Sequence, residues 1–260
     1  MDEQLNFVQL ITERLTSVGV EYMLTGSMAM AAYGNPRMTR DVDIVMECSE
    51  KDADPIVRLF EKDCYINRDA VVEAVANRSM FNIIHNEWII KADFIVRKDD
   101  VYHQTEFDRR REITVAGNSL VIVAPEDLIL SKLKWAQESR SELQIRDVRE
   151  LMATGILSIA NISNTGRKAL VSSRCYGILT MDDTSPDVVK RFRDMMSSRT
   201  PEERLGMASR MFTTARKLVA SGAGADQDEA GRRRHAFLKF YGKDFSEADR
   251  SRILQRLNEL

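Results

Sequence analysis

The chain has 260 residues, of which 43% are hydrophobic and 30% charged, and its formal net charge is −2. This composition is ordinary for a soluble globular protein with a sizeable core, as one large domain or two small ones. No apolar run approaches the ~18 residues of a membrane span, and the start Met1–Gln4 is unlike a signal peptide. We therefore expect a cytoplasmic protein with no membrane partner. The cysteines are too few and scattered to predict a disulfide framework or a zinc site; they are Cys48, Cys64 and Cys175.

The charges are distributed unevenly along the chain. Residues 1–150 carry 19 Lys and Arg against 27 Asp and Glu, whereas residues 181–260 carry 16 against 13. An acidic first part beside a mildly basic tail indicates two modules. The tail either faces a polyanionic partner such as RNA or is an ordinary solvated helical surface.

The first residues alternate between helical and strand patterns. Gln4–Val18 has apolar residues on one helical face and Gly19 as its stop. Val20–Leu24 reads as a short buried strand, and Gly26-Ser27 then forms a turn into a small-residue helix, Met28–Tyr33. The free backbone N–H groups at the start of that helix are suited to bind a phosphate.

The next predicted strand carries Asp41 and Asp43. Residues two apart in a strand point to the same face, with Cα atoms about 6.6 Å apart. Two neighbouring carboxylates are costly unless a cation neutralises them, and Mg²⁺ carried in with a nucleoside triphosphate (NTP) is the usual one. A solvated edge strand is the alternative for such a short motif. The preceding Gly26-Ser27 turn favours the metal and nucleotide site.

These residues carry a resemblance to a known family. Gly26-Ser27, Tyr33-Gly34 and the residues Arg37, Thr39, Arg40, Asp41, Val42 and Asp43 resemble the signature of the nucleotidyltransferase (polymerase-β-like) superfamily. The segment Gly34 to Asp43 is most similar to the small bacterial branch that includes the AbiEii-type toxins of abortive-infection and toxin–antitoxin systems. The resemblance covers residues 1–152 and implies a third carboxylate on a neighbouring strand.

Asp93 is the candidate for that third carboxylate. Met80–Ile84 and Glu87–Val96 read as an antiparallel hairpin, so we expect a mixed sheet. In the second strand of the hairpin, Lys91 and Asp93 share one face and apolar residues share the other. The resemblance implies that Asp41, Asp43 and Asp93 are the catalytic residues and hold two Mg²⁺ ions.

Lys132 is a candidate triphosphate ligand. It lies in a predicted helix that begins at Pro125, and the resembled family has a lysine in a comparable helix. Lys134 competes for this role, and a solvated surface lysine is the other alternative. Arg146-Asp147 resembles the Arg/Lys-Asp motif of the family.

The remaining nucleotide-binding candidates surround the acidic strand. Gly26 and Ser27 are expected to hold the β- and γ-phosphates through backbone N–H and hydroxyl groups. Arg37 and Arg40 either offset phosphate charge or pair with a nearby acid. The sequence leaves these two alternatives open.

The C-terminal part reads as helices after a connector at residues 153–181. Thr200 and Glu203 form a capping box, and Ser246 is a further N-cap. Helically spaced residues are expected to face a core within residues 182–260; they are Met207, Met211, Ala215 and Leu218. The cluster 232–234, three arginines, either touches phosphate or keeps its helix soluble.

The predicted fold is therefore α/β (α+β), with a nucleotidyltransferase core at residues 1–152 and an all-helical region at residues 182–260. The expected activity is Mg²⁺-dependent transfer of a nucleoside monophosphate (NMP) from an NTP to an acceptor. The resemblance prompts tRNA or another RNA as the acceptor, a toxin role and a cognate antitoxin as partner. Two alternatives are an enzyme that nucleotidylates small molecules or proteins, and a nucleotide-binding protein without catalysis.

Overall fold

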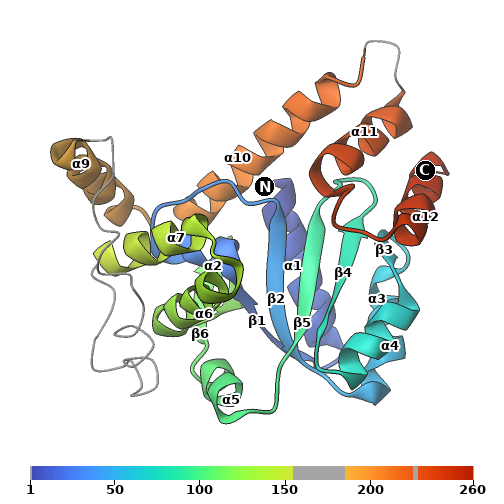
Figure 1. The fold of residues 1–260 in the computed structure, drawn as a ribbon, viewed down its shortest axis with the longest axis horizontal. Coiled ribbons are helices and arrows are strands. Elements are labelled where there is room, and N and C mark those ends of the chain that lie inside the picture. The colour runs from blue at the N-terminus through green and yellow to red at the C-terminus, as the bar shows by residue number, and fades with distance from the viewer. Residues whose placement is uncertain (1, 155–184, 225–227, 260) are drawn as a thin grey trace.

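A central mixed sheet organises the computed structural model, which describes residues 2–154, 185–224 and 228–259. Within these residues, seven strands form one sheet in the order β3-β4-β5-β2-β1-β7-β6 (Figure 1). The strands are β1 (Glu21–Thr25), β2 (Asp41–Glu47), β3 (Cys64–Ile66), β4 (Met80–His85), β5 (Lys91–Val96), β6 (Arg111–Val115) and β7 (Asn118–Ile122). The predicted connector at residues 153–181 lies outside the described residues from 155 onward, as does Cys175.

The strand pairings confirm the predicted mixed sheet. β2 is antiparallel to β1 and parallel to β5, while β4 and β5 form the expected antiparallel hairpin. β5 begins at Lys91 rather than at Glu87, because the turn is longer than predicted and contains Ile89 at a φ of 49°. The alternation in β2 is as expected, with Val42 and Ile44 fully buried on the face opposite the aspartates.

Helices cover both sides of this sheet (Figure 1). Those before the connector are α1 (Glu3–Ser17), α2 (Gly26–Tyr33), α3 (Ala53–Phe60), α4 (Arg68–Ala76), α5 (Val101–Asp108), α6 (Pro125–Ser139) and α7 (Glu142–Ala153), with a short 3₁₀ helix at Glu50–Asp52. Those after it are α9 (Pro186–Ser197), α10 (Pro201–Ser221), α11 (Glu229–Tyr241) and α12 (Glu247–Asn258).

The C-terminal helices share their core with the N-terminal part. α10 packs on α1 and α2, and it crosses above the sheet in Figure 1. Leu205 and Phe212 of α10 and Phe237 of α11 belong to the same buried cluster as Phe7 of α1 and Met28 of α2. The division into domains at residues 1–152 and 182–260 stays a prediction. Among the described residues, α10 and α11 contribute to the hydrophobic core that covers the sheet and do not form a hydrophobic core of their own.

The expected buried face of α10 is wrong at Met211 and Leu218, while Met207 and Ala215 are half-buried. Met211 is 40% exposed and Leu218 68% exposed, whereas Leu205, Ala208 and Phe212 are fully buried. Both sets repeat at helical spacing, so periodicity alone did not distinguish them; the packing against α2 selects the second set. The predicted caps are confirmed, because Thr200 and Glu203 form the capping box and Ser246 accepts from the N–H of Asp249.

The described cysteines have no catalytic surroundings. Cys48 and Cys64 are free and buried, and burial raises the pKa of Cys48 to about 12. Such thiols are protonated at neutral pH and inert. Within the described residues, none of the helices is both long and apolar enough to cross a membrane.

The shared core predicts that a C-terminal substitution destabilises the whole protein. Phe212→Ala is expected to lower the free energy of unfolding by about 3–5 kcal/mol, the cost of truncating a buried aromatic residue. Met211→Ala, on the exposed side of the same helix, is expected to stay within about 0.5 kcal/mol. Urea unfolding followed by fluorescence and circular dichroism measures both, and a Phe212→Ala transition confined to part of the helical signal would contradict the shared core.

Candidate active site

The three predicted catalytic aspartates lie together on two neighbouring strands. Asp41 and Asp43 point to one face of β2, and β5 runs parallel beside it with Asp93 directly opposite Asp43. The side chain of Asp93 is 10% exposed and that of Asp41 24% exposed. The fold thus joins residues that are 50 positions apart into one half-buried acidic cluster.

This cluster carries an excess of negative charge. Burial and the neighbouring Asp93 and Asp41 raise the pKa of Asp43 to about 7. Burial also raises the pKa values of Asp41 and Asp93, although Lys91 opposes the shift in both. Carboxylates whose charged forms are disfavoured in this way are typical of a site that receives a cation.

Lys91 is a site residue for which the sequence predicted a position but no role. Its Nζ lies 3.0 Å from Oδ2 of Asp93, 3.7 Å from Oδ2 of Asp41 and 3.6 Å from Oδ2 of Asp244. Burial opposes charge on Lys91, but the carboxylates outweigh it and raise its pKa. The strand alternation that placed Lys91 on the face of Asp93 was the available signal.

The C-terminal segment forms a wall of the site that sequence reasoning missed. Tyr241, at the end of α11, is fully buried, and its Oη donates to the carbonyl of Arg40 at 2.7 Å. Arg40 donates to the carbonyl of Phe240 and lies 3.8 Å from Asp244. Of the two roles that the sequence left open for Arg40, the structure shows pairing with an acid, Asp244. No local pattern marked Tyr241 or Asp244, which reach the site only through the packing of α11.

The Gly26-Ser27 turn lies against Asp43. Gly26 adopts a φ of +64°, and a Cβ there would lie only 2.0 Å from Oδ2 of Asp43. Glycine is thus required both by the backbone conformation and by the close approach of the carboxylate. Because α2 begins at Gly26, the first N–H groups of this helix have no partners within the helix.

Lys132 is buried, and Arg37 is paired with an acid. Asp147 accepts from Nε and Nη2 of Arg37 at 2.9 and 2.7 Å and from Nζ of Lys132 at 2.6 Å. Arg37 also donates to Oγ of Ser27 at 2.6 Å, which links this group to the turn. Lys132 is only 4% exposed, whereas Lys134 is exposed, so the surface alternative for Lys132 is excluded.

In this group two cations, Arg37 and Lys132, share one carboxylate, that of Asp147. Burial lowers the pKa of Lys132. The positive charge of Lys132 in turn opposes the rise in the pKa of Asp43. Burial opposes charge on Asp147, but Arg37 and Lys132 outweigh it and lower its pKa. Of the resembled motif Arg146-Asp147, Asp147 is the member that contacts Arg37 and Lys132.

The donor set fits a divalent cation. Oδ1 of Asp41 and Oδ1 of Asp93 are buried and have no hydrogen-bond partner, and carboxylate oxygens are the ligands that Mg²⁺ prefers. In the described part of the chain, no three Asp, Glu, His or Cys side chains are already arranged as a metal-binding group. The ammonium of Lys91 occupies the space between the carboxylates instead.

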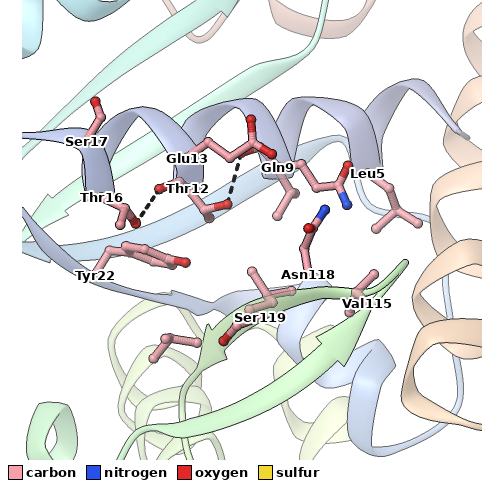
Figure 2. A pocket seen from close by; sticks show the side chains of 13 residues that line it. Leu5, Gln9, Thr12, Glu13, Thr16, Ser17, Tyr22, Val115, Asn118 and Ser119 are labelled. Atoms are coloured by element: carbon pink, nitrogen blue, oxygen red, sulfur yellow. Dashed lines mark hydrogen bonds between the residues drawn. The ribbon is translucent and has the colours of Figure 1, made fainter.

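None of the three aspartates lines either of two cavities in the part of the chain that the structure describes. One of about 570 Å³ lies between α1 and β7, where Thr12, Tyr22 and Asn118 line it (Figure 2). A second of about 380 Å³ borders the Arg37–Asp147 pair and also touches α9. Only the second is continuous with residues of the candidate site.

Comparison with known proteins shows a likeness to solved structures. No protein-family model and no curated protein matches the chain. A crystal structure of an antigenic nucleotidyltransferase-like protein from Paracoccidioides brasiliensis matches at a TM-score of 0.45 and 14% identity. The match covers 77% of this chain and 95% of that one.

The glycine turn yields a matched pair of substitutions. Gly19 has a φ of +72°, and a Cβ added there would meet no atom within 4 Å. A Cβ added at Gly26 would collide with the carboxylate of Asp43. Gly19→Ala is expected to lower the free energy of unfolding by about 1–2 kcal/mol through backbone strain alone. Gly26→Ala is expected to cost clearly more, because the collision displaces Asp43. Equal losses in urea unfolding would show that Asp43 does not press against the turn.

The buried Asp147 group yields a second prediction. Asp147→Asn leaves the ammonium of Lys132 buried without its counter-charge, and removing one partner of a buried pair typically costs about 3–5 kcal/mol of stability. Asp54 pairs with Arg68 at the surface, so Asp54→Asn is the matched control and should cause no measurable change. Thermal unfolding of both variants checks this, and similar melting temperatures would contradict the structural importance of Asp147.

Proposed function

We propose that this chain is a Mg²⁺-dependent nucleotidyltransferase, which moves an NMP from an NTP to an acceptor. The observation that carries the proposal is the position of Asp43, which lies opposite Asp93 and against the Gly26-Ser27 turn. Negative charge, free N–H groups and a buried lysine thereby lie around one point of the sheet. A nucleotide with a bound metal ion satisfies all three.

In this reaction the acceptor oxygen attacks the α-phosphorus, the bond from that phosphorus to the bridging oxygen breaks, and pyrophosphate leaves. Asp93 is placed to accept the proton of the acceptor hydroxyl, because its Oδ1 has no hydrogen-bond partner. Asp41, Asp43 and Asp93 would hold two Mg²⁺ ions. When bound, these would activate the acceptor and neutralise charge on the phosphates.

The triphosphate is assigned to the turn and the adjacent cations. Backbone N–H groups at Gly26 and Ser27 bind the β- and γ-phosphates at the start of α2. Lys132 and Arg37 lie next to this position, and their shared Asp147 holds both in place. Arg40 faces the other side of the carboxylates and contributes its positive charge there.

The proposed acceptor is a cellular RNA. RNA, including tRNA, is the first acceptor to test because of the family resemblance. The arginine cluster 232–234 adds little support, since Arg233 pairs with Glu229 and Arg234 binds Asn258. A toxin role with a cognate antitoxin rests on the same resemblance alone. Growth arrest on tightly controlled expression, lost in an Asp41→Asn/Asp43→Asn variant, is the result that this role requires.

The activity is tested by label transfer. Purified protein with Mg²⁺ and each NTP labelled at the α-phosphate is expected to label total cellular RNA. The Asp41→Asn/Asp43→Asn variant should lose at least about 100-fold in rate, as when a group that stabilises charge at a reacting centre is removed. Asp108→Asn, an exposed aspartate, is the matched control and should keep full activity.

The outcomes separate the acceptor classes. Label in protein would move the proposal to protein nucleotidylation. Label in neither pool, with transfer to small metabolites, would identify a small-molecule acceptor. Binding of Mg²⁺-NTP without transfer to any pool would overturn the enzymatic assignment and leave a nucleotide-binding protein.

A further inference from the structure

Lys91 lies where a cation bound by the carboxylates would lie. Its side chain is 8% exposed, and it contacts Oδ2 of Asp93 and of Asp41 while the Oδ1 atoms of both remain without partners. One ammonium group has only three donors, and here it leaves two buried acceptors unsatisfied. The cluster is thus neutralised in part by a lysine of the chain itself.

The position of Lys91 follows from the sheet and from α11. Lys91 pairs with Asp41 across β2 and β5, and Asp93 is two residues further along the same strand face. Tyr241 covers this region, with its ring centre 6.0 Å from Nζ of Lys91 and its Oη 3.4 Å from the backbone N of Lys91. The lysine is therefore enclosed by the sheet and by a buried aromatic ring.

Asp244 offers a second position for the ammonium. It follows α11 in a turn, where its N–H donates to the carbonyl of Tyr241 at 2.9 Å. Its carboxylate lies 3.6 Å from Nζ of Lys91 and its side chain is 27% exposed, more than those of Asp41 or Asp93. At 3.6 Å the contact is an ion pair rather than a close hydrogen bond, so it can shorten if the lysine moves.

We propose that Lys91 competes with the divalent cation for Asp41 and Asp93, and that Asp244 holds the Lys91 ammonium once the cation is bound. This inference rests on the proposed function only in assuming that a cation binds these carboxylates. In the absence of metal, the ammonium of Lys91 then offsets the repulsion between Asp41 and Asp93 and so stabilises the fold around them. When the cation displaces the Lys91 ammonium from Asp41 and Asp93, Asp244 provides another carboxylate for it, which lowers the free-energy cost of the displacement.

The test measures metal binding directly, without catalysis. Mn²⁺ is titrated into the full-length protein by calorimetry and by electron paramagnetic resonance of free Mn²⁺. Lys91→Met removes the competing charge and keeps the length of the side chain, so the Kd for Mn²⁺ is expected to fall at least about tenfold, the equivalent of 1.4 kcal/mol. Lys98→Met, an exposed lysine just beyond β5, is the matched control and should leave the Kd unchanged.

Thermal unfolding gives an independent readout. In EDTA, Lys91→Met is expected to unfold at a lower temperature than the wild type, because the carboxylates then repel one another without a counter-ion. Mn²⁺ should raise the melting temperature of Lys91→Met more than that of the wild type. An equal rise in both proteins, with equal Kd values, would overturn the competition.

Asp244→Asn tests the second half of the proposal and keeps the carboxylates of Asp41 and Asp93. It is expected to weaken Mn²⁺ binding in the wild type, because the displaced ammonium loses its alternative partner. In the Lys91→Met background the same substitution should have no effect, which a double-mutant cycle measures. An equal loss in both backgrounds would show that Asp244 acts on the metal ion itself, as a ligand or through its charge, and would overturn its role as the partner of Lys91. If Lys91→Met fails to fold, an unchanged Kd in Asp244→Asn still overturns the proposal.

The failure of this inference is distinct from failure of the proposed function. A wild type that transfers label, with Lys91→Met binding Mn²⁺ no more tightly, removes the competition and keeps the enzyme. A wild type that transfers no label, with tighter Mn²⁺ binding in Lys91→Met, removes the enzyme and supports the competition.

Discussion

The parallel pairing of β2 with β5 is the constraint on which the rest of the site depends. It sets Asp43 against Asp93 and Asp41 against Lys91, so that charged side chains share a half-buried face of the sheet. Carboxylates in such surroundings are costly unless cations lie near them. The chain supplies these cations from β5, α6 and the segment before β2, and the arrangement of the site follows from that requirement.

The C-terminal helices belong to the same electrostatic unit as the sheet. Tyr241 is buried between Arg40 and Lys91, and Asp244 follows it in the next turn. Hydrophobic packing of α10 and α11 on the N-terminal core holds these residues in place. Asp244, about 150 residues beyond β5 in the sequence, therefore forms an ion pair with Lys91 of that strand. Stability of the helices and chemistry of the site are coupled through this contact.

Local patterns in the sequence predicted the parts of the site that lie on regular elements. Alternation placed Asp41, Asp43 and Asp93 on strand faces, and a glycine before a helix predicted the turn at Gly26. The roles of Lys91 and Asp244 depend on the contact between β5 and the end of α11, which are far apart in the sequence. Strand or helix periodicity in the sequence does not predict such a contact. The same reason explains the incorrect core face of α10, where two sets of residues had helical spacing and only packing against α2 distinguished Phe212 from Met211.

Two groups of similar composition flank the carboxylates, and their geometries differ in a way that separates their tasks. Lys132 and Arg37 share Asp147, and Lys91 and Arg40 share Asp244. In the first group the contacts to the shared aspartate are 2.6–2.9 Å and the aspartate is buried, which is the geometry of a fixed scaffold. In the second they are 3.6 and 3.8 Å and the aspartate is partly exposed, so little energy is lost when the partners rearrange. In the proposed reaction, a fixed group would keep the triphosphate in place, and a rearranging group would let metal ions enter and leave.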